Sequence, residues 1–183
     1  MNNEVSEYAD AKIPKVVRVF HGMFIEWLQF YKTSEKTVEI VGTGDEKISA
    51  TATIDVARSI VQLSLLLKAS TEPEKGTASI PTYVYVSGST ATFNEGAKLT
   101  GRELKKISIE EARVKFKKLL EEEGRSHSTV RTASYGFMLK SFVAEGWFNY
   151  SNDNHNELVN PGQSRWKWSQ WQDFAPQFAG GNS

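Results

Sequence analysis

Histidine is the side chain that most often carries acid–base chemistry near neutral pH, and the chain has three of them. His21, His127 and His155 lie far apart in sequence, and none belongs to the H-x-x-x-H or H-E-x-x-H spacing that places two zinc ligands on one helical face. Ser126 and Ser128 flank His127, but adjacent residues of a helix do not face each other, so a serine–histidine pair is not expected. The histidines therefore predict neither a metal site nor a catalytic pair.

The carboxylates and the one glycine-rich loop give no catalytic arrangement either. Apart from Asp45 and Glu46 in that loop, neighbouring acidic residues occur within charged, helix-like stretches, at 110–111 and 121–123. The loop Gly42-Thr43-Gly44-Asp45-Glu46 lacks the spacing of a Walker phosphate loop, and no Ser or Thr follows Lys47. The chain has no Cys, which excludes disulfides, thiolate nucleophiles and Cys-ligated metals. We therefore expect a non-enzymatic protein without a cofactor or a metal.

Basic side chains are the more promising group. The whole chain has 22 basic and 22 acidic residues, but residues 98–143 hold eleven basic against six acidic ones. Such a stretch either keeps a helix face solvated or faces a polyanion. If it faces a polyanion, the candidate nucleic-acid contacts, with two more cations near the C-terminus, are Arg113, Lys117, Arg125, Ser128, Arg131, Ser134, Lys140, Arg165 and Lys167.

Aromatic residues gather in the last part of the chain. In Arg165-Trp166-Lys167-Trp168 cations alternate with indoles, which could stack on bases or, more commonly, pack on their own domain. An arm so rich in large apolar side chains is expected to dock on its own domain or on a neighbouring subunit. The candidate subunit-docking residues are Trp166, Trp168, Trp171, Phe174 and Phe178.

Residues 108–148 are the clearest structural element and are predicted to form two consecutive helices. Ser108 and Glu111 have the S-x-x-E spacing of a capping box, and Gly124 ends the first helix. The second helix, residues 128–144, is apolar around most of its circumference, which is typical of a helix inside a core.

The remaining elements are predicted from periodicity. Aromatic residues at helical spacing indicate a helix over 15–31, although β-branched residues and Gly22 weaken its first half. Alternation predicts β-hairpins over 37–54 and 82–93, with a turn at 94–96. An apolar stripe predicts another helix over 55–69.

Together these elements predict an α+β, mostly helical fold: a four-helix core with two β-hairpins and extended N- and C-terminal arms. We expect a mobile arm over 1–13, a single core domain over 14–150 and an aromatic arm over 151–183. No stretch has the roughly 18 apolar residues of a membrane span, and the N-terminus does not resemble a signal peptide. We therefore expect no membrane association, and a location inside the cell or within a viral particle.

Three functions remain open. The first is a structural subunit that forms homo-oligomers on nucleic acid, expected to be single-stranded and bound without sequence preference. With its Cys-free helical core, polar hairpins and two arms, the predicted architecture is loosely similar to that of helical plant-virus coat proteins. The second is a winged-helix DNA-binding protein with 128–144 as recognition helix and 147–168 as wing, although that helix is too apolar to lie exposed in a groove. The third is a protein-interaction module that binds no nucleic acid. The first is the preferred hypothesis.

Overall fold

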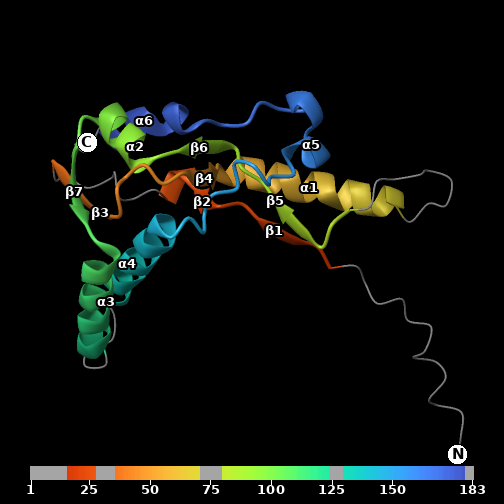
Figure 1. Cartoon of the computed structure of the whole chain (residues 1–183). Coiled ribbons are helices and arrows are strands. Elements are labelled where there is room, and N and C mark those ends of the chain that lie inside the picture. The colour runs from red at the N-terminus through yellow and green to blue at the C-terminus, as the bar shows by residue number, and fades with distance from the viewer. Residues whose placement is uncertain (1–15, 28–35, 71–79, 124–129, 180–183) are drawn as a thin grey trace, which may run out of the picture.

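Three small, mostly parallel β-sheets and the helices that connect them make up the computed structural model (Figure 1). The structure describes residues 16–27, 36–70, 80–123 and 130–179. The strands are β1 (Arg18–Phe20), β2 (Met23–Phe24), β3 (Thr37–Val41), β4 (Ile48–Thr51), β5 (Tyr83–Tyr85), β6 (Ser89–Ala91) and β7 (Glu103–Ile107). The helices are α1 (Thr53–Ser70), α2 (Phe93–Thr100), α3 (Ile109–Glu123), α4 (Val130–Ala144), α5 (Asn156–Val159) and α6 (Trp171–Ala179), with short 3-10 turns at Ile25–Trp27 and Pro161–Gln163.

Every sheet joins strands that are distant in sequence. β1 pairs with β5, and β3 pairs with β7, both in parallel. β4 is the middle strand of the third sheet, with β2 parallel on one side and β6 antiparallel on the other. Parallel partners need long crossover connections, so the intervening helices are part of how these sheets form.

The prediction of a helix over 15–31 is wrong over residues 16–27, the part of this range that the structure describes. The chain there forms β1, β2 and a 3-10 turn at Ile25–Trp27, while residues 28–31 lie outside the described part. Val16, Val17 and Val19 favour extended backbone. Gly22 has a φ of 69°, which lets the chain step from the β1–β5 ribbon to the β2–β4–β6 sheet.

Both predicted hairpins are wrong in their pairing, although their strands exist. β3 and β4 belong to different sheets, as do β5 and β6. The loop between β3 and β4 turns the chain, but each strand finds a longer-range partner. Alternation of side chains marks a strand without naming its neighbour, because the partner depends on which faces are buried together.

The predictions for three helices are confirmed, whereas α2 and β7 were not predicted, and neither were α5 and α6, which lie in the segment predicted to be an extended C-terminal arm. α1, α3 and α4 match 55–69, 108–123 and 128–144 closely. Ser108 caps α3 by accepting a hydrogen bond from the Glu111 amide at 3.0 Å. The turn predicted at 94–96 is instead part of α2, which begins with a complete capping box between Thr92 and Glu95. β7 was missed because its sequence, Glu-Leu-Lys-Lys-Ile, is mostly charged.

The apolar side chains form three clusters. The central cluster lies between the β2–β4–β6 sheet, β3, α2 and α4, and includes Phe93, Val143 and Trp171. A second fills the space between the β1–β5 ribbon, α1 and the C-terminal segment, around Val84 and Trp168. A third, smaller one holds α3 and α4 against β3 and β7.

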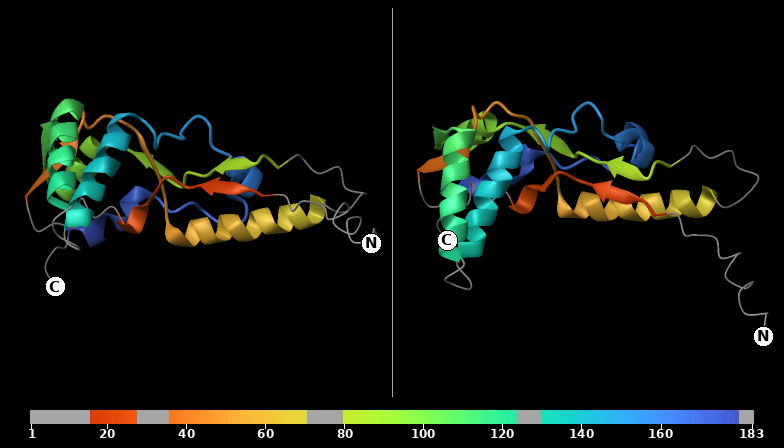
Figure 2. Two further views of the ribbon diagram at one scale, coloured as in Figure 1. Left: turned by 90° about the horizontal axis from the view of Figure 1, so that it is seen from below. Right: turned by 60° about the horizontal axis from the view of Figure 1, so that its bottom comes forward.

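The molecule is elongated (Figure 2). The α3–α4 hairpin projects from one end, and α1 extends along the body toward the other end (Figures 1 and 2). Among the described residues, no helix is both long enough and apolar enough to cross a membrane.

Candidate nucleic-acid interface

The β1–β5 ribbon presents its aromatic residues on one face. Its parallel register places Arg18 beside Tyr83 and Phe20 beside Tyr85. Because successive side chains of a strand alternate between faces, Val19 and Val84 point into the core while these four residues point outward. The outward face of the ribbon thus carries three aromatic rings and one guanidinium.

These rings continue into a larger aromatic surface. Phe20 stacks on Tyr85, with ring centroids 5.1 Å apart and planes at 25°, and lies 6.2 Å from Tyr83. Tyr85 also contacts Tyr150, at 5.1 Å, and stacks on His155, at 6.0 Å. Tyr83 is 50% exposed and Phe20 is 38% exposed, so both offer ring surface to a ligand. We call this surface the aromatic ribbon; its members are Arg18, Phe20, Tyr83, Tyr85, Tyr150 and His155.

A backbone clamp holds the aromatic ribbon in shape. His155 donates its amide hydrogen to the Tyr85 carbonyl at 2.6 Å, and its Nδ1 accepts from the Tyr85 amide at 3.1 Å. Asn156 repeats the pattern on Ser87 with its side-chain amide, at 3.0 Å and 2.7 Å. His155 and the first residue of α5 therefore bind the end of β5 and the residues that follow it. Since His155 Nδ1 is an acceptor, the neutral ring carries its hydrogen on Nε2.

Charge on the aromatic ribbon is sparse. The Arg18 guanidinium lies over the Tyr83 ring, 5.6 Å from its centroid. Burial, aided by nearby Tyr85, raises the pKa of Tyr150, so its hydroxyl stays protonated at neutral pH. The surface can therefore stack planar groups and donate a few hydrogen bonds, but it provides one positive charge.

The basic residues predicted on the α3–α4 hairpin are only partly available. Lys117 is exposed on α3, whereas Arg113 pairs with Glu145 at 3.1 Å. Burial lowers the pKa of Lys140, whose ammonium lies 5.6 Å from the Phe137 ring centroid. Arg125 and Ser128, as well as His127, lie outside the described residues, and Arg131 and Ser134 are within α4 with side chains that are not described.

The other two predicted cations lie elsewhere. Arg165 and Lys167 are exposed on the segment between α5 and α6, which runs along the body and away from the α3–α4 hairpin (Figure 1). Of the predicted nucleic-acid residues whose side chains the structure describes, those on the α3–α4 hairpin and the two before α6 do not share one surface.

Four of the five predicted subunit-docking residues pack on their own chain. Trp168 and Trp171 are 5% and 1% exposed, and Trp166 and Phe174 pack against the same clusters. Phe178 belongs to α6, but its side chain is not described. A subunit contact through Trp168 or Trp171 would require the C-terminal segment to leave its place.

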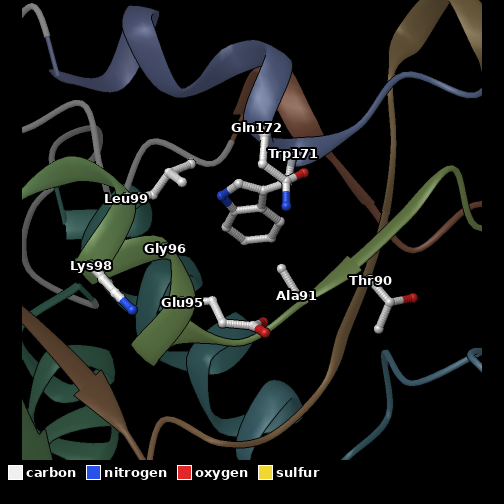
Figure 3. Close-up of a pocket in the computed structure, with 8 residues that line it drawn as sticks. All are labelled: Thr90, Ala91, Glu95, Gly96, Lys98, Leu99, Trp171 and Gln172. Carbon is white, nitrogen blue, oxygen red and sulfur yellow. The ribbon is translucent and has the colours of Figure 1, made fainter.

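A pocket of about 520 Å³ lies between α2 and α6. Figure 3 shows the Trp171 indole between Leu99 on one side and Glu95 with Ala91 on the other. The Glu95 carboxylate already accepts a hydrogen bond from the Thr92 amide at 2.8 Å, as part of the helix cap. The carboxylate of Glu95 is therefore already engaged in the cap of α2, and the other polar side chains of the lining are Thr90, Lys98 and Gln172.

Two other candidate features have structural explanations. In the loop 42–46, the Glu46 carboxylate accepts hydrogen bonds from the amides of Thr43 and Gly44, both at 2.8 Å, so it takes the place that a phosphate would need. The wing of the winged-helix alternative is missing, because residues 147–168, all of them described, form turns, α5 and a 3-10 turn but no strand. In the part of the chain that the structure describes, no group of His, Asp and Glu side chains could hold a metal ion.

No protein-family model, curated protein or solved structure matches the chain.

Sequence reasoning missed the aromatic ribbon although part of its signal was present. Tyr83 and Tyr85 alternate with two valines, which marks two aromatic residues on one face of a strand. Phe20 could not be added to them, because residues 15–31 were interpreted as a helix. Tyr150 and His155 gave no local signal, since their loop becomes informative only when it lies beside β5.

Proposed function

We propose that this chain is a non-enzymatic subunit that binds single-stranded nucleic acid without sequence preference and assembles with further copies along the strand, as a nucleocapsid or coat subunit does. Such a subunit would act inside a cell or within a viral particle. The observation that carries the proposal is the aromatic ribbon, where exposed rings and a guanidinium share one face of two paired strands.

Stacking is the expected source of affinity. Every base has a π-face, so an aromatic surface binds single strands with little sequence preference, at about 1–3 kcal/mol per stacked base. Tyr83 and Phe20 are the exposed rings that a base could reach. Tyr85 is held in place by His155 and forms the floor of the surface. The rings are therefore already oriented before a ligand binds.

The salt dependence of binding can distinguish the aromatic ribbon from the basic α3–α4 hairpin as the binding surface. The net charge of the chain is zero, and Arg18 is the one cation of the aromatic ribbon. For single strands, log K falls with log salt by about 0.7 for each neutralised phosphate. We expect a slope of about −0.7, whereas binding through many lysines of the α3–α4 hairpin would give a much steeper one.

An interaction module without nucleic acid is the second candidate. The observation in its favour is the exposed apolar face of α1, formed by Ile54, Ile60, Val61 and Leu65.

The test is fluorescence anisotropy with a labelled oligouridylate. Tyr83→Ala should weaken binding by about 5- to 150-fold, the equivalent of one stacked base, while Tyr83→Phe should retain most of the affinity because the ring is kept. Trp147→Ala is the matched control, since Trp147 is an exposed ring, 64% accessible, that stacks on Phe142 rather than on a ring of the aromatic ribbon. Absence of binding by the wild type would refute the proposal, as would equal losses in Tyr83→Ala and Trp147→Ala.

A further inference from the structure

His155 binds both backbone groups of one member of the aromatic ribbon, Tyr85. The His155 amide donates to the Tyr85 carbonyl at 2.6 Å, and His155 Nδ1 accepts from the Tyr85 amide at 3.1 Å. The strand β1 does not serve the Tyr85 amide, because parallel strands bond through alternate residues, and on that edge of β5 Val86 donates to the Phe20 carbonyl at 2.8 Å. The Tyr85 amide therefore depends on a lone pair of the His155 ring.

That lone pair exists only while the His155 ring is neutral. A neutral imidazole has one nitrogen that donates and one that accepts, whereas both nitrogens of the protonated ring donate. A proton on Nδ1 would place two N–H groups against each other at 3.1 Å, and turning the ring over would bring a carbon to the same place. Histidine is the side chain whose charge ordinarily changes between about pH 5 and pH 8. The proton and the Tyr85 amide thus compete for one atom.

The described groups around His155 are uncharged, exposed or already paired. Asp153 and Glu157, the nearest acidic residues in sequence, are exposed, and the Glu157 carboxylate accepts a backbone hydrogen bond at 2.8 Å. Burial raises the pKa of Tyr150, so its hydroxyl stays uncharged at neutral and acidic pH. None of these described carboxylates is bonded to His155, so protonation loses a hydrogen bond without gaining an ion pair. The other charged or titratable groups of the neighbouring elements β1, β5 and α1 are Arg18, Tyr83, Tyr85, Lys68 and the ion pair of Asp55 with Arg58.

Tyr85 is the ring through which a change at His155 reaches the rest of the aromatic ribbon. The Tyr85 ring centroid lies 6.0 Å from that of His155, 5.1 Å from that of Phe20 and 5.1 Å from that of Tyr150. We propose that His155 is the positioning residue of the aromatic ribbon, that it acts only as the neutral ring, and that acid therefore releases single-stranded nucleic acid from this surface. The inference rests on the proposed function.

The direction of this pH effect is opposite to that of ordinary electrostatics. A proton adds positive charge to the protein, and positive charge strengthens binding to a polyanion. Release through His155 instead weakens binding on acidification, because the rings lose their arrangement while the charge rises. Oligouridylate is the suitable probe, since neither uracil nor the phosphodiester takes up a proton over the range in which histidine does. A weaker complex at acidic pH is therefore attributable to the protein.

Hydrogen exchange of the nucleic-acid-free protein tests the clamp alone. Between about pH 8 and about pH 5, the protection factor of the Tyr85 amide should fall by about fivefold, the equivalent of one hydrogen bond, after correction for the intrinsic exchange rate. The Ser87 amide is the internal control, because it donates to Asn156 Oδ1 at 3.0 Å and an amide oxygen does not titrate in this range. Its protection factor should stay constant, which would show that the loss at Tyr85 is local.

Fluorescence anisotropy with oligouridylate, carrying a dye that does not titrate in this range, tests the release. The wild type should bind about fivefold more weakly at about pH 5 than at about pH 8. In His155→Asn, Oδ1 takes the place of Nδ1 and can accept from the Tyr85 amide at either pH, so the pH dependence should disappear. His155→Phe keeps a ring but has no acceptor, so it should bind at both pH values as weakly as the acidified wild type. His21→Phe is the control: His21 stacks on Phe24, and its replacement should leave the pH dependence of binding in place.

Three results would overturn the inference. They are wild-type binding that is unchanged or tighter at acidic pH, a Tyr85 amide that loses no more protection than the Ser87 amide, and a pH dependence that persists in His155→Asn. Absence of oligouridylate binding at both pH values would refute the proposed function and the acid release together. Binding that does not weaken with acid would refute the acid release alone and leave the aromatic ribbon as the proposed binding surface.

Discussion

Gly22 is the position where a single added methyl group should do the most damage. Its φ of 69° is in the left-handed region, and a Cβ placed on it would lie 2.0 Å from the backbone oxygen of Ser49 on β4. Gly101 has nearly the same φ, 66°, but nothing lies within 4 Å of its added Cβ. Gly22→Ala and Gly101→Ala therefore share the backbone strain and differ in the steric contact.

The expected loss in the free energy of unfolding of each variant follows from that comparison. Left-handed backbone strains Ala by about 1–2 kcal/mol, and Gly101→Ala should lose about that much. Real Cβ atoms essentially never approach other atoms within 3.0 Å. In Gly22→Ala, β2 and β4 must therefore move apart by about 1 Å, which loosens the pairing of Met23 with Ala50. Overpacking of about 1–3 kcal/mol and a weakened hydrogen bond of about 1 kcal/mol add to the strain. We expect a loss of about 3–6 kcal/mol in Gly22→Ala.

Urea unfolding followed by circular dichroism measures both losses. Since domains of this size unfold at about 5–15 kcal/mol, Gly22→Ala should lower the midpoint strongly or leave the chain partly unfolded at room temperature. A Gly22→Ala loss within about 1 kcal/mol of the Gly101→Ala loss would refute the close approach of β2 to β4, and with it the step that carries the chain from the β1–β5 ribbon into the central sheet.

Three further predictions concern buried or paired polar groups. Asp55→Ala should lower the free energy of unfolding by about 2–4 kcal/mol, because the buried carboxylate accepts a hydrogen bond from the Ser169 amide at 2.8 Å and pairs with Arg58. A loss below about 0.5 kcal/mol would contradict a stabilising role of these two contacts. Burial alone would raise the pKa of Glu39, but hydrogen bonds from two lysines outweigh burial, and the pKa is lowered. The wild type should therefore be more stable than Glu39→Gln at neutral pH. This advantage should shrink as the pH falls through the folded-state pKa of Glu39. An advantage that does not change with pH would contradict the ion pairs. Burial lowers the pKa of His21, so the unfolded chain takes up the proton first as the pH falls below 6.5. In urea titrations at falling pH, the wild type should therefore lose stability faster than His21→Phe. Parallel losses in the two proteins would contradict the lowered pKa of His21.

The parts of the fold that could be predicted are those fixed by local sequence. α1, α3 and α4 each carry their period, and Ser108 marks the start of α3 with its side chain. These signals act within one or two turns and do not depend on the rest of the molecule. The parallel pairing of β3 with β7 depends on strands that are separated by two helices, and β7 itself is mostly charged, so no local pattern could name the pair.

The candidate site shows the same limit. Tyr83 and Tyr85 could be placed on one face of a strand, but Phe20 joins them only after β1 forms, and the helical spacing of the aromatic residues concealed that strand. The indoles were predicted to dock on their own domain or on a neighbouring subunit, and the structure packs Trp168 and Trp171 on their own chain. A sequence cannot distinguish these two kinds of packing.

The most direct test of the central proposal is to locate bound nucleic acid on the protein. Ultraviolet cross-linking to oligouridylate followed by mass spectrometry of the peptides should place the cross-links in residues 16–24, 80–86 and 148–156, which carry the aromatic ribbon. Cross-links confined to residues 109–144, or spread without preference over the chain, would contradict the account.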